Sequence, residues 1–354
     1  MTTTITEPPQ AEKHVAPQAD HADRQKTLLT RIAQLRAWLF LAALIIAFEI
    51  WSRTSFGGTF VGSSFNWQSI AIFAVAPLLL AVGQTFVIIS GGIDLSEGFV
   101  MGLAAVIAAH MTNLAGFYMP LPFAMLFGIL VAVISSGVPG MINGLLISRL
   151  RVPPFIGTLG MFGVARGAAF LFAGGTTVPV RNEYFAMLGN GRLFGVPYLV
   201  IVAAIFVLVM HYVLSQTRFG QHNYAIGANA QAARRAGIDI KAHLLKLYVL
   251  SAMCAGLGGA LYAARFTAGA AQAGEPLLLD SVAAVVIGGA SLFGGSGSIL
   301  GTVAGALVIA VIQYGLVFVN VEPFWQFIAV GVVIIISVLI DQAQRRFGGA
   351  KHDE

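Results

Sequence analysis

Charged residues are scarce in this sequence, and cysteine is almost absent. Only 10% of the 354 residues are Asp, Glu, Lys or Arg, whereas 57% are hydrophobic. About a quarter of the residues in an average soluble domain are charged, so this composition excludes an ordinary soluble domain and predicts an integral membrane protein. The single Cys254 lies in an apolar run, which excludes a disulfide framework, and no Cys/His cluster indicates a metal site.

Catalytic and nucleotide-binding motifs are also missing. The chain has no G-x-x-x-x-G-K-[ST] phosphate loop, no G-x-S-x-G elbow and no H-E-x-x-H pair. We therefore predict that the chain is not an enzyme, and that any energy it uses comes from an ion gradient or from a separate protein. The basic residues lie in short gaps between apolar runs, so the net charge of +5 indicates membrane topology rather than binding to nucleic acid.

Long apolar runs fill most of the chain. Because a helix needs about 20 apolar residues to cross the hydrocarbon, they predict an all-α membrane protein with about ten transmembrane helices. The predicted membrane domain covers 37–341, between a disordered cytoplasmic N-terminal tail at 1–36 and a cytoplasmic C-terminal tail at 342–354. The predicted spans are 37–52, 67–89, 97–116, 122–148, 154–174, 197–216, 247–266, 281–293, 297–319 and 323–341. The eighth is short and is expected to be re-entrant or continuous with its neighbour.

Basic residues are distributed unevenly over the alternate loops. With the N-terminus inside, only Arg53, Arg181 and Arg192 of the 20 Lys and Arg residues fall in outside segments, while Arg166 and Arg265 fall within or at the edges of spans. This positive-inside bias predicts that both termini are cytoplasmic and that the number of crossings is even.

The longest inside loop, 217–246, carries its own helix signal. Asn229 is a suitable N-cap, an alanine-rich body follows, and Gly237 is a suitable C-terminal stop. We expect either that a partner protein grips this short helix or that the helix only links two spans and contacts the anionic leaflet. The candidate contact residues are Asn229, Ala232, Ala233, Arg234, Arg235 and Gly237.

The stretch "FVIISGGIDLSEG" at 86–98 interrupts an apolar run with two glycines and two carboxylates. A Gly91-Gly92 break inside a membrane protein is tolerated only where protein or a water-filled cavity surrounds it. Asp94 and Ser96 lie where the next helix begins, which predicts Asp94 as its N-cap. The alternatives are that Asp94 lines the path of a transported solute or couples to protons.

Other polar or small residues are weaker candidates for a translocation pathway or gate. "GGASLFGG" at 288–295 shares the form G-G-x-x-L-x-x-G with 91–98, which predicts an internal repeat that includes Gly288 and Gly289. In "PPFIGTLGMFGVARG" the glycines and Thr158 are expected at packing positions, and Arg166 needs a carboxylate, a carbonyl or water. Asn143 ends another span near the cytoplasm and is expected to bond across helices or cap a helix end.

Four segments together resemble a known family: "GQTFVIISGGIDLSEG", "NGLLISRLRVPPFIGTLGMFGVARG", "YAIGANAQAARRAGIDI" and "LDSVAAVVIGGASLFGGSGSILGT". They are similar to the inner-membrane permease subunits of ABC-type sugar importers, the ribose and xylose permease group, over residues 66 to 341. The resemblance implies a homodimer in the bacterial inner membrane with the helical fold of the vitamin B12-type permease. It also implies cytoplasmic ATPase subunits that bind ATP and Mg, a periplasmic sugar-binding protein, and a coupling helix at 229–237 that docks on the ATPase. No cofactor is expected in this chain.

The main alternative is a gradient-driven secondary sugar transporter. That class usually buries ionisable residues in the middle of its spans, and here the spans are nearly free of acids. A channel would need a ring of polar pore residues, which the sequence does not show. The sequence does not specify the sugar: pentoses, hexoses and polyols all fit.

Overall fold

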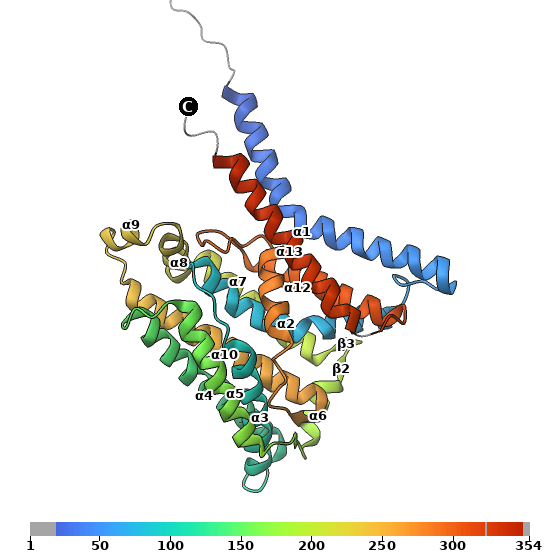
Figure 1. The fold of residues 1–354 in the computed structure, drawn as a ribbon. Coiled ribbons are helices and arrows are strands. Elements are labelled where there is room, and N and C mark those ends of the chain that lie inside the picture. The colour runs from blue at the N-terminus through green and yellow to red at the C-terminus, as the bar shows by residue number, and fades with distance from the viewer. Residues whose placement is uncertain (1–18, 323, 350–354) are drawn as a thin grey trace, which may run out of the picture. The chain divides into compact units, whose positions relative to one another are not determined.

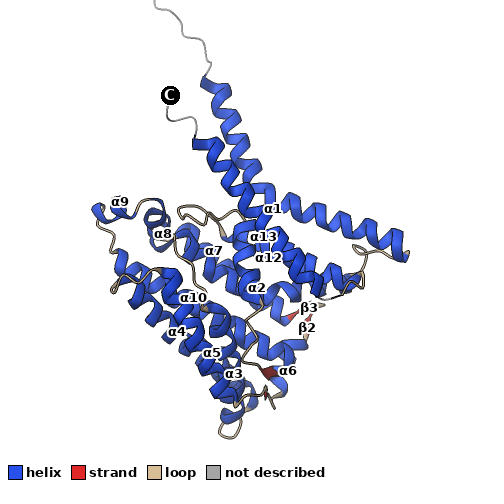
Figure 2. Cartoon of the chain, in the orientation of Figure 1, coloured by secondary structure: helices blue, strands red, loops and turns tan. Residues whose placement is uncertain are grey.

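The computed structural model describes residues 19–322 and 324–349, and most of them are helical (Figures 1 and 2). The chain divides into two compact units, 1–36 and 37–354. In the first unit the described residues, 19–36, are the beginning of helix α1 (Ala19–Phe56). The sequence predicts a disordered tail here, but 19–36 contains no Gly or Pro and is rich in good helix formers. The rest of the predicted tail lies outside the described residues.

The second unit contains the membrane helices. Seven of them are α2 (Ser64–Ile89), α3 (Glu97–Ala115), α4 (Leu121–Ser148), α5 (Pro154–Ala173), α7 (Tyr198–Gln216), α10 (Ile240–Phe266) and α12 (Ile299–Phe318). With the apolar part of α1 they make eight helices, among the described residues, that are long and apolar enough to cross a membrane. The protein is therefore an all-helical membrane protein.

Two shorter apolar helices account for the difference from the predicted ten. Helix α11 (Leu277–Ile287) has 11 residues and lies at the short eighth predicted span. At 1.5 Å per residue it is about 16 Å long, roughly half the hydrocarbon thickness. Helix α13 (Phe324–Gly349) is apolar over Phe324–Ile336 and continues through the start of the predicted tail 342–354, whose last residues, 350–354, lie outside the described part.

The connections contain small elements that the sequence does not predict. Helix α6 (Glu183–Asn190) lies between two short antiparallel pairings, in which β1 (Val178–Pro179) pairs with β4 (Ala268–Gly269) and β2 (Arg192–Leu193) pairs with β3 (Val196–Pro197). The loop 217–246 contains two helices, α8 (Arg218–Ala228) and α9 (Ala230–Arg235), rather than the one predicted.

Helix α10 packs against α2, α3 and α4, and small residues allow the close approach. A Cβ at Gly259 would lie 2.2 Å from the carbonyl oxygen of Met101, so the backbones of α10 and α3 nearly touch there. Helices α4, α5 and α7 instead leave large apolar side chains exposed on one face, such as Leu130, Val164 and Leu208. This arrangement places a tightly packed centre around the end of α2.

Candidate functional site

Helix α2 ends at the predicted glycine break. Gly91 has a φ of +85°, its amide donates to Ile88 O (2.9 Å), and the Gly92 amide donates to Val87 O (3.0 Å). This pair of bonds is the Schellman motif, in which a left-handed residue, usually glycine, closes the helix. The predicted break is thus confirmed, and the chain turns into a short segment before α3.

Asp94 anchors that segment through three donors. Its Oδ1 accepts from the backbone amide (3.0 Å) and hydroxyl (2.6 Å) of Ser96, and its Oδ2 accepts from the hydroxyl of Ser251 on α10 (3.0 Å). The prediction that Asp94 is the N-cap of α3 is wrong by two positions, because Ser96 precedes the first helical residue, Glu97. Asp94 still satisfies a backbone amide just before the helix, and it is fully buried.

Two amide side chains hold the same segment from neighbouring helices. Gln84 Oε1 of α2 accepts from the Asp94 amide (3.2 Å), and Asn143 Nδ2 of α4 donates to Ser96 Oγ (2.9 Å). The predicted cross-helix bond of Asn143 is confirmed. Gln84 and Ser251 were not singled out from the sequence, because only the packing of α2 and α10 brings them to the break.

Glu97, the first residue of α3, is also fully buried and contacts the hydroxyl of Ser281 on α11. Thr158 of α5 reaches the segment more weakly: its hydroxyl lies 2.9 Å from Pro154 O in its own helix and 3.3 Å from Ile93 O. We call Gln84, Asp94, Ser96, Glu97, Asn143, Ser251 and Ser281 the buried polar cluster. It joins five helices around the α2–α3 break.

Arg166 lies apart from the acidic residues of this cluster. Its guanidinium carbon is 5.3 Å from the centre of the Phe99 ring, its side chain is exposed, and it forms no ion pair among the described residues. The aromatic face, rather than the expected carboxylate or carbonyl, is its partner. Gly160 and Gly163, expected at packing positions, have no atom within 4 Å of a Cβ built on them. This face of α5 is therefore open in the single chain.

The second glycine pair forms a similar break after α11. Gly289 has a φ of +93°, and the amides of Gly289 and Ala290 donate to Val286 O and Val285 O, 3.0 and 3.1 Å away. The bond pattern matches that after α2, but the left-handed residue is the second glycine, Gly289, rather than Gly288. The predicted repeat therefore holds for the turn, with a shift of one residue in the alignment.

The two breaks contact each other through the backbone. The Gly295 amide donates to Ile89 O (2.8 Å), and the hydroxyls of Thr85 and Thr302 are hydrogen-bonded at 2.7 Å. The end of α2 and the segment after α11 thus form one unit.

Helix α8 is wedged against both breaks. Asn223 Nδ2 donates to Phe86 O of α2 (2.9 Å), and the Tyr224 hydroxyl donates to Gly297 O (2.8 Å). A Cβ at Gly227 would lie only 1.8 Å from Ile89 O and 2.5 Å from Gly295 N, so only glycine fits there. We call these contacts of α8 with 86–89 and 294–297 the α8 junction.

Helix α9 follows α8 after one residue, Asn229, and has the predicted caps. The Asn229 side chain accepts from the Ala232 amide (3.0 Å), and the Gly237 and Ile238 amides donate to Arg234 O and Ala233 O. Gly237 has a φ of +85°, which completes a further Schellman motif. The predicted N-cap and C-terminal stop are confirmed.

Most of the α9 surface is open. The two arginines of its last turn, Arg234 and Arg235, are exposed, as is Ala232, whereas Ala233 is buried. Ala233 therefore packs inward, although it is a candidate contact residue in the sequence analysis. Among the described residues no group of three or more His, Cys, Asp or Glu could hold a metal ion.

Comparisons with known proteins place these features in a family. A family model described as "Branched-chain amino acid transport system / permease component" matches residues 66–338. The ribose import permease of Escherichia coli K12 is 33% identical over 88% of this chain and 96% of its own length. The fructose import permease of Rhizobium meliloti is 35% identical over 79% of this chain and 77% of its own. The ribose import permease of Bacillus subtilis is 38% identical over 75% and 80%.

The chain belongs to the permease family of ABC-type sugar importers. No solved structure matches it. The predicted family is confirmed, and this permease is a transport component rather than an enzyme. The matched range 66–338 includes the buried polar cluster, the α8 junction and α9, whereas the first part of α1 lies outside it.

Proposed function

We propose that this permease moves a monosaccharide or a polyol into the cell on energy from ATP. Its relatives are named for the import of ribose, fructose and galactose, so a pentose or hexose is the expected class of substrate. As a permease component it works with separate ATPase subunits, which bind ATP and Mg, and with a periplasmic binding protein that delivers the sugar. It spans the bacterial inner membrane with both termini in the cytoplasm, as the distribution of Lys and Arg indicates.

The observation that carries the proposal is the continuous connection from α9 to the membrane breaks. Helix α9 is exposed, closed by its own caps and one residue away from α8, and α8 is wedged between the ends of α2 and the α11 segment. An ATPase that binds Arg234, Arg235 and the Gly237 turn moves α9, and the α8 junction transmits that movement. The breaks and the buried polar cluster then act as the gate.

The residues of the buried polar cluster form part of a gate rather than the lining of an open path for the sugar. Asp94, Ser96 and Asn143 of the cluster, and Thr158 beside it, are buried within the chain, where no solute reaches them in this conformation. Gly91, Gly92, Gly288 and Gly289 form the turns that hold the cluster in place. Asp94 accordingly holds the α2–α3 segment.

A second copy of the chain completes the pathway, and we propose that it packs on the open face of α5. Gly160, Gly163 and Gly167 lie on this face, where a Cβ would meet nothing within 4 Å. Small residues spaced three and four apart allow two membrane helices to approach closely. Gly163→Leu should weaken the dimer in cross-linking and light scattering, while Gly331→Leu, on the open surface of α13, should not. A dimer that persists unchanged with Gly163→Leu contradicts this interface.

Reconstitution tests the energy source. Proteoliposomes with the permease and its ATPase should accumulate sugar only with ATP in the compartment that contains the ATPase and with binding protein on the other side. Uptake should survive a protonophore. Accumulation by the permease alone on a proton or sodium gradient would favour the secondary transporter and refute the proposal.

A further inference from the structure

Two carboxyl groups of the buried polar cluster, Asp94 and Glu97, lie three residues apart with no cation beside them. Both are fully buried, and neither forms an ion pair among the described residues. The nearby titratable groups Tyr248 and Cys254 of α10 supply no positive charge, and the Arg166 guanidinium is at the face of Phe99. Two adjacent carboxylates in such a site do not both ionise readily, because each destabilises the charge of the other.

The hydrogen bonds around Asp94 are those of an ionised carboxylate. Ser96 N–H, Ser96 O–H and Ser251 O–H all point to its oxygens. Since Ser96 donates its only hydroxyl hydrogen to Asp94, its oxygen accepts from Asn143 Nδ2, so each hydrogen has one acceptor. Asp94 needs no hydrogen of its own.

The contacts of Glu97 are one hydrogen short. The Ser281 hydroxyl lies 2.7 Å from Leu278 O, a carbonyl that can only accept, and it also contacts Glu97 Oε1. One hydroxyl hydrogen makes a full hydrogen bond to only one of these acceptors, and a bond shared between both is weaker. If Ser281 donates to Leu278, the hydrogen between Ser281 and Glu97 belongs to Glu97. The other oxygen, Glu97 Oε2, is buried and has no partner, which is costly for a charged carboxylate and far less so for a neutral acid.

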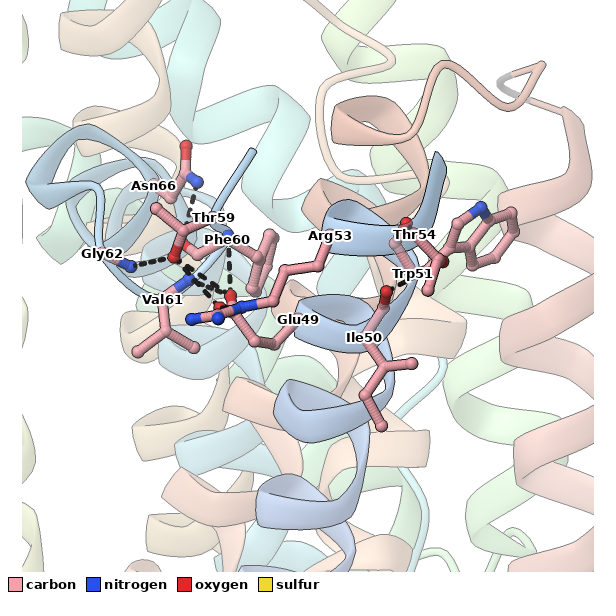
Figure 3. A network of polar contacts seen from close by, with 10 residues as sticks. All are labelled: Glu49, Ile50, Trp51, Arg53, Thr54, Thr59, Phe60, Val61, Gly62 and Asn66. Carbon is pink, nitrogen blue, oxygen red and sulfur yellow. Dashed lines mark hydrogen bonds and ion pairs between the residues drawn. The ribbon is translucent and has the colours of Figure 1, made fainter. Parts of the chain in front are cut away.

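Glu49 shows what an ionised glutamate looks like in the same chain (Figure 3). Its Oε1 accepts from Arg53 Nε (2.5 Å), and its Oε2 accepts from the amides of Phe60 and Val61 (2.7 and 2.8 Å). The Thr59 hydroxyl lies 3.1 and 3.2 Å from its two oxygens. Every partner is a donor, and both oxygens are satisfied. Glu97 has one hydroxyl partner, which also contacts Leu278 O, and one oxygen without a partner.

We propose that Glu97 is a proton-binding site: it is a neutral carboxylic acid that donates its proton to Ser281 and so joins α3 to α11, while Asp94 is the anion of the pair. The proton is a fixed part of the buried polar cluster. The same hydrogen bond would be made by a glutamine, whose side-chain N–H₂ donates where the acid O–H does.

Infrared difference spectroscopy of the purified full-length permease tests this directly and does not depend on its transport activity. The C=O stretch of a protonated carboxylic acid should be present in the wild type and lost in Glu97→Gln. It should persist in Asp94→Asn, and Glu49→Gln should change only carboxylate bands. Asp280, a buried acid bonded to Gln313, is common to all these samples and cancels in the differences. A carboxylate band lost in Glu97→Gln, with the acid band unchanged, overturns the proposal.

A second variant covers the case in which Glu97→Gln folds poorly. Ser281→Ala removes the acceptor, so the acid band should remain and move to higher frequency; an unmoved band overturns the assigned partner.

Discussion

Helices α8 and α9 are neighbours in one loop, yet different contacts hold them in place. Helix α9 keeps its own ends closed, through the Asn229 side chain and the Gly237 turn, and most of its surface is exposed. Helix α8 is held by the chain around it, through Asn223, Tyr224 and the tight contact of Gly227. The difference indicates two separate roles. Helix α9, whose ends are closed by its own caps, presents a surface to a partner, and α8 transmits the movement of α9 to the two glycine breaks.

At Gly227 the α8 junction leaves no room for a side chain. A leucine there would place side-chain atoms into Ile89 O and Gly295 N, and overpacking of this kind costs about 1 to 3 kcal/mol or more. Gly227→Leu should therefore lower the melting temperature of the permease by several degrees and abolish uptake. Gly331→Leu, where a Cβ meets nothing within 4 Å, is the matched control and should leave stability unchanged. Normal stability of Gly227→Leu would show that the junction is not tight in the working protein.

Asp94 lies in the buried polar cluster and outside the loop 217–246, so its variants test the gate while α8 and α9 stay unchanged. Asp94→Ala leaves the buried donors of Ser96 and Ser251 without an acceptor, at a cost of about 1 to 3 kcal/mol each. Stability and uptake should both fall. Asp94→Asn keeps an oxygen for Ser96, and Ser251 can accept from the new N–H₂, so stability and uptake should stay near normal.

A stable Asp94→Asn protein that binds its ATPase but does not transport would contradict that expectation. It would place the negative charge of Asp94 in the path of the sugar. Thermal melting, ATPase binding and uptake measured on the same preparation distinguish the two results.

Tyr224 should give the smallest effect. Tyr224→Phe removes one hydrogen bond, to Gly297 O, and keeps the ring in place, so it should cost about 0.5 to 1.5 kcal/mol. Uptake should fall modestly, with ATPase binding unchanged because α9 is intact. Weaker ATPase binding in Tyr224→Phe would mean that α8 itself is part of the docking surface.

The same contrast explains what the sequence could predict. The caps of α9 depend on residues within nine positions of one another, so Asn229 and Gly237 were identified correctly from local signals. Helix α8 was missed because it is fixed by the distant Phe86 and Gly297.

At the α2–α3 break, too, the features set by nearby residues were predictable and those set by distant residues were not. Gly91 and Gly92 were predicted as a turn from their own residue types, but the partners of the acids lie far along the chain, as Ser251 does from Asp94 and Ser281 from Glu97. The spacing of Gly160 and Gly163 predicts a packing face, but sequence spacing does not show which neighbour such a face meets, and within the single chain it is open.

Variants of Gly237 show whether α9 is the coupling element. Valine at a φ of +85° is strained by about 1 to 3 kcal/mol, whereas asparagine tolerates this conformation. In proteoliposomes with ATPase and binding protein, Gly237→Val should lose uptake and stimulated ATPase activity together by about tenfold or more, with the membrane part stable. Gly237→Asn should retain most of both. Normal coupled transport by Gly237→Val would show that α9 is not the coupling element.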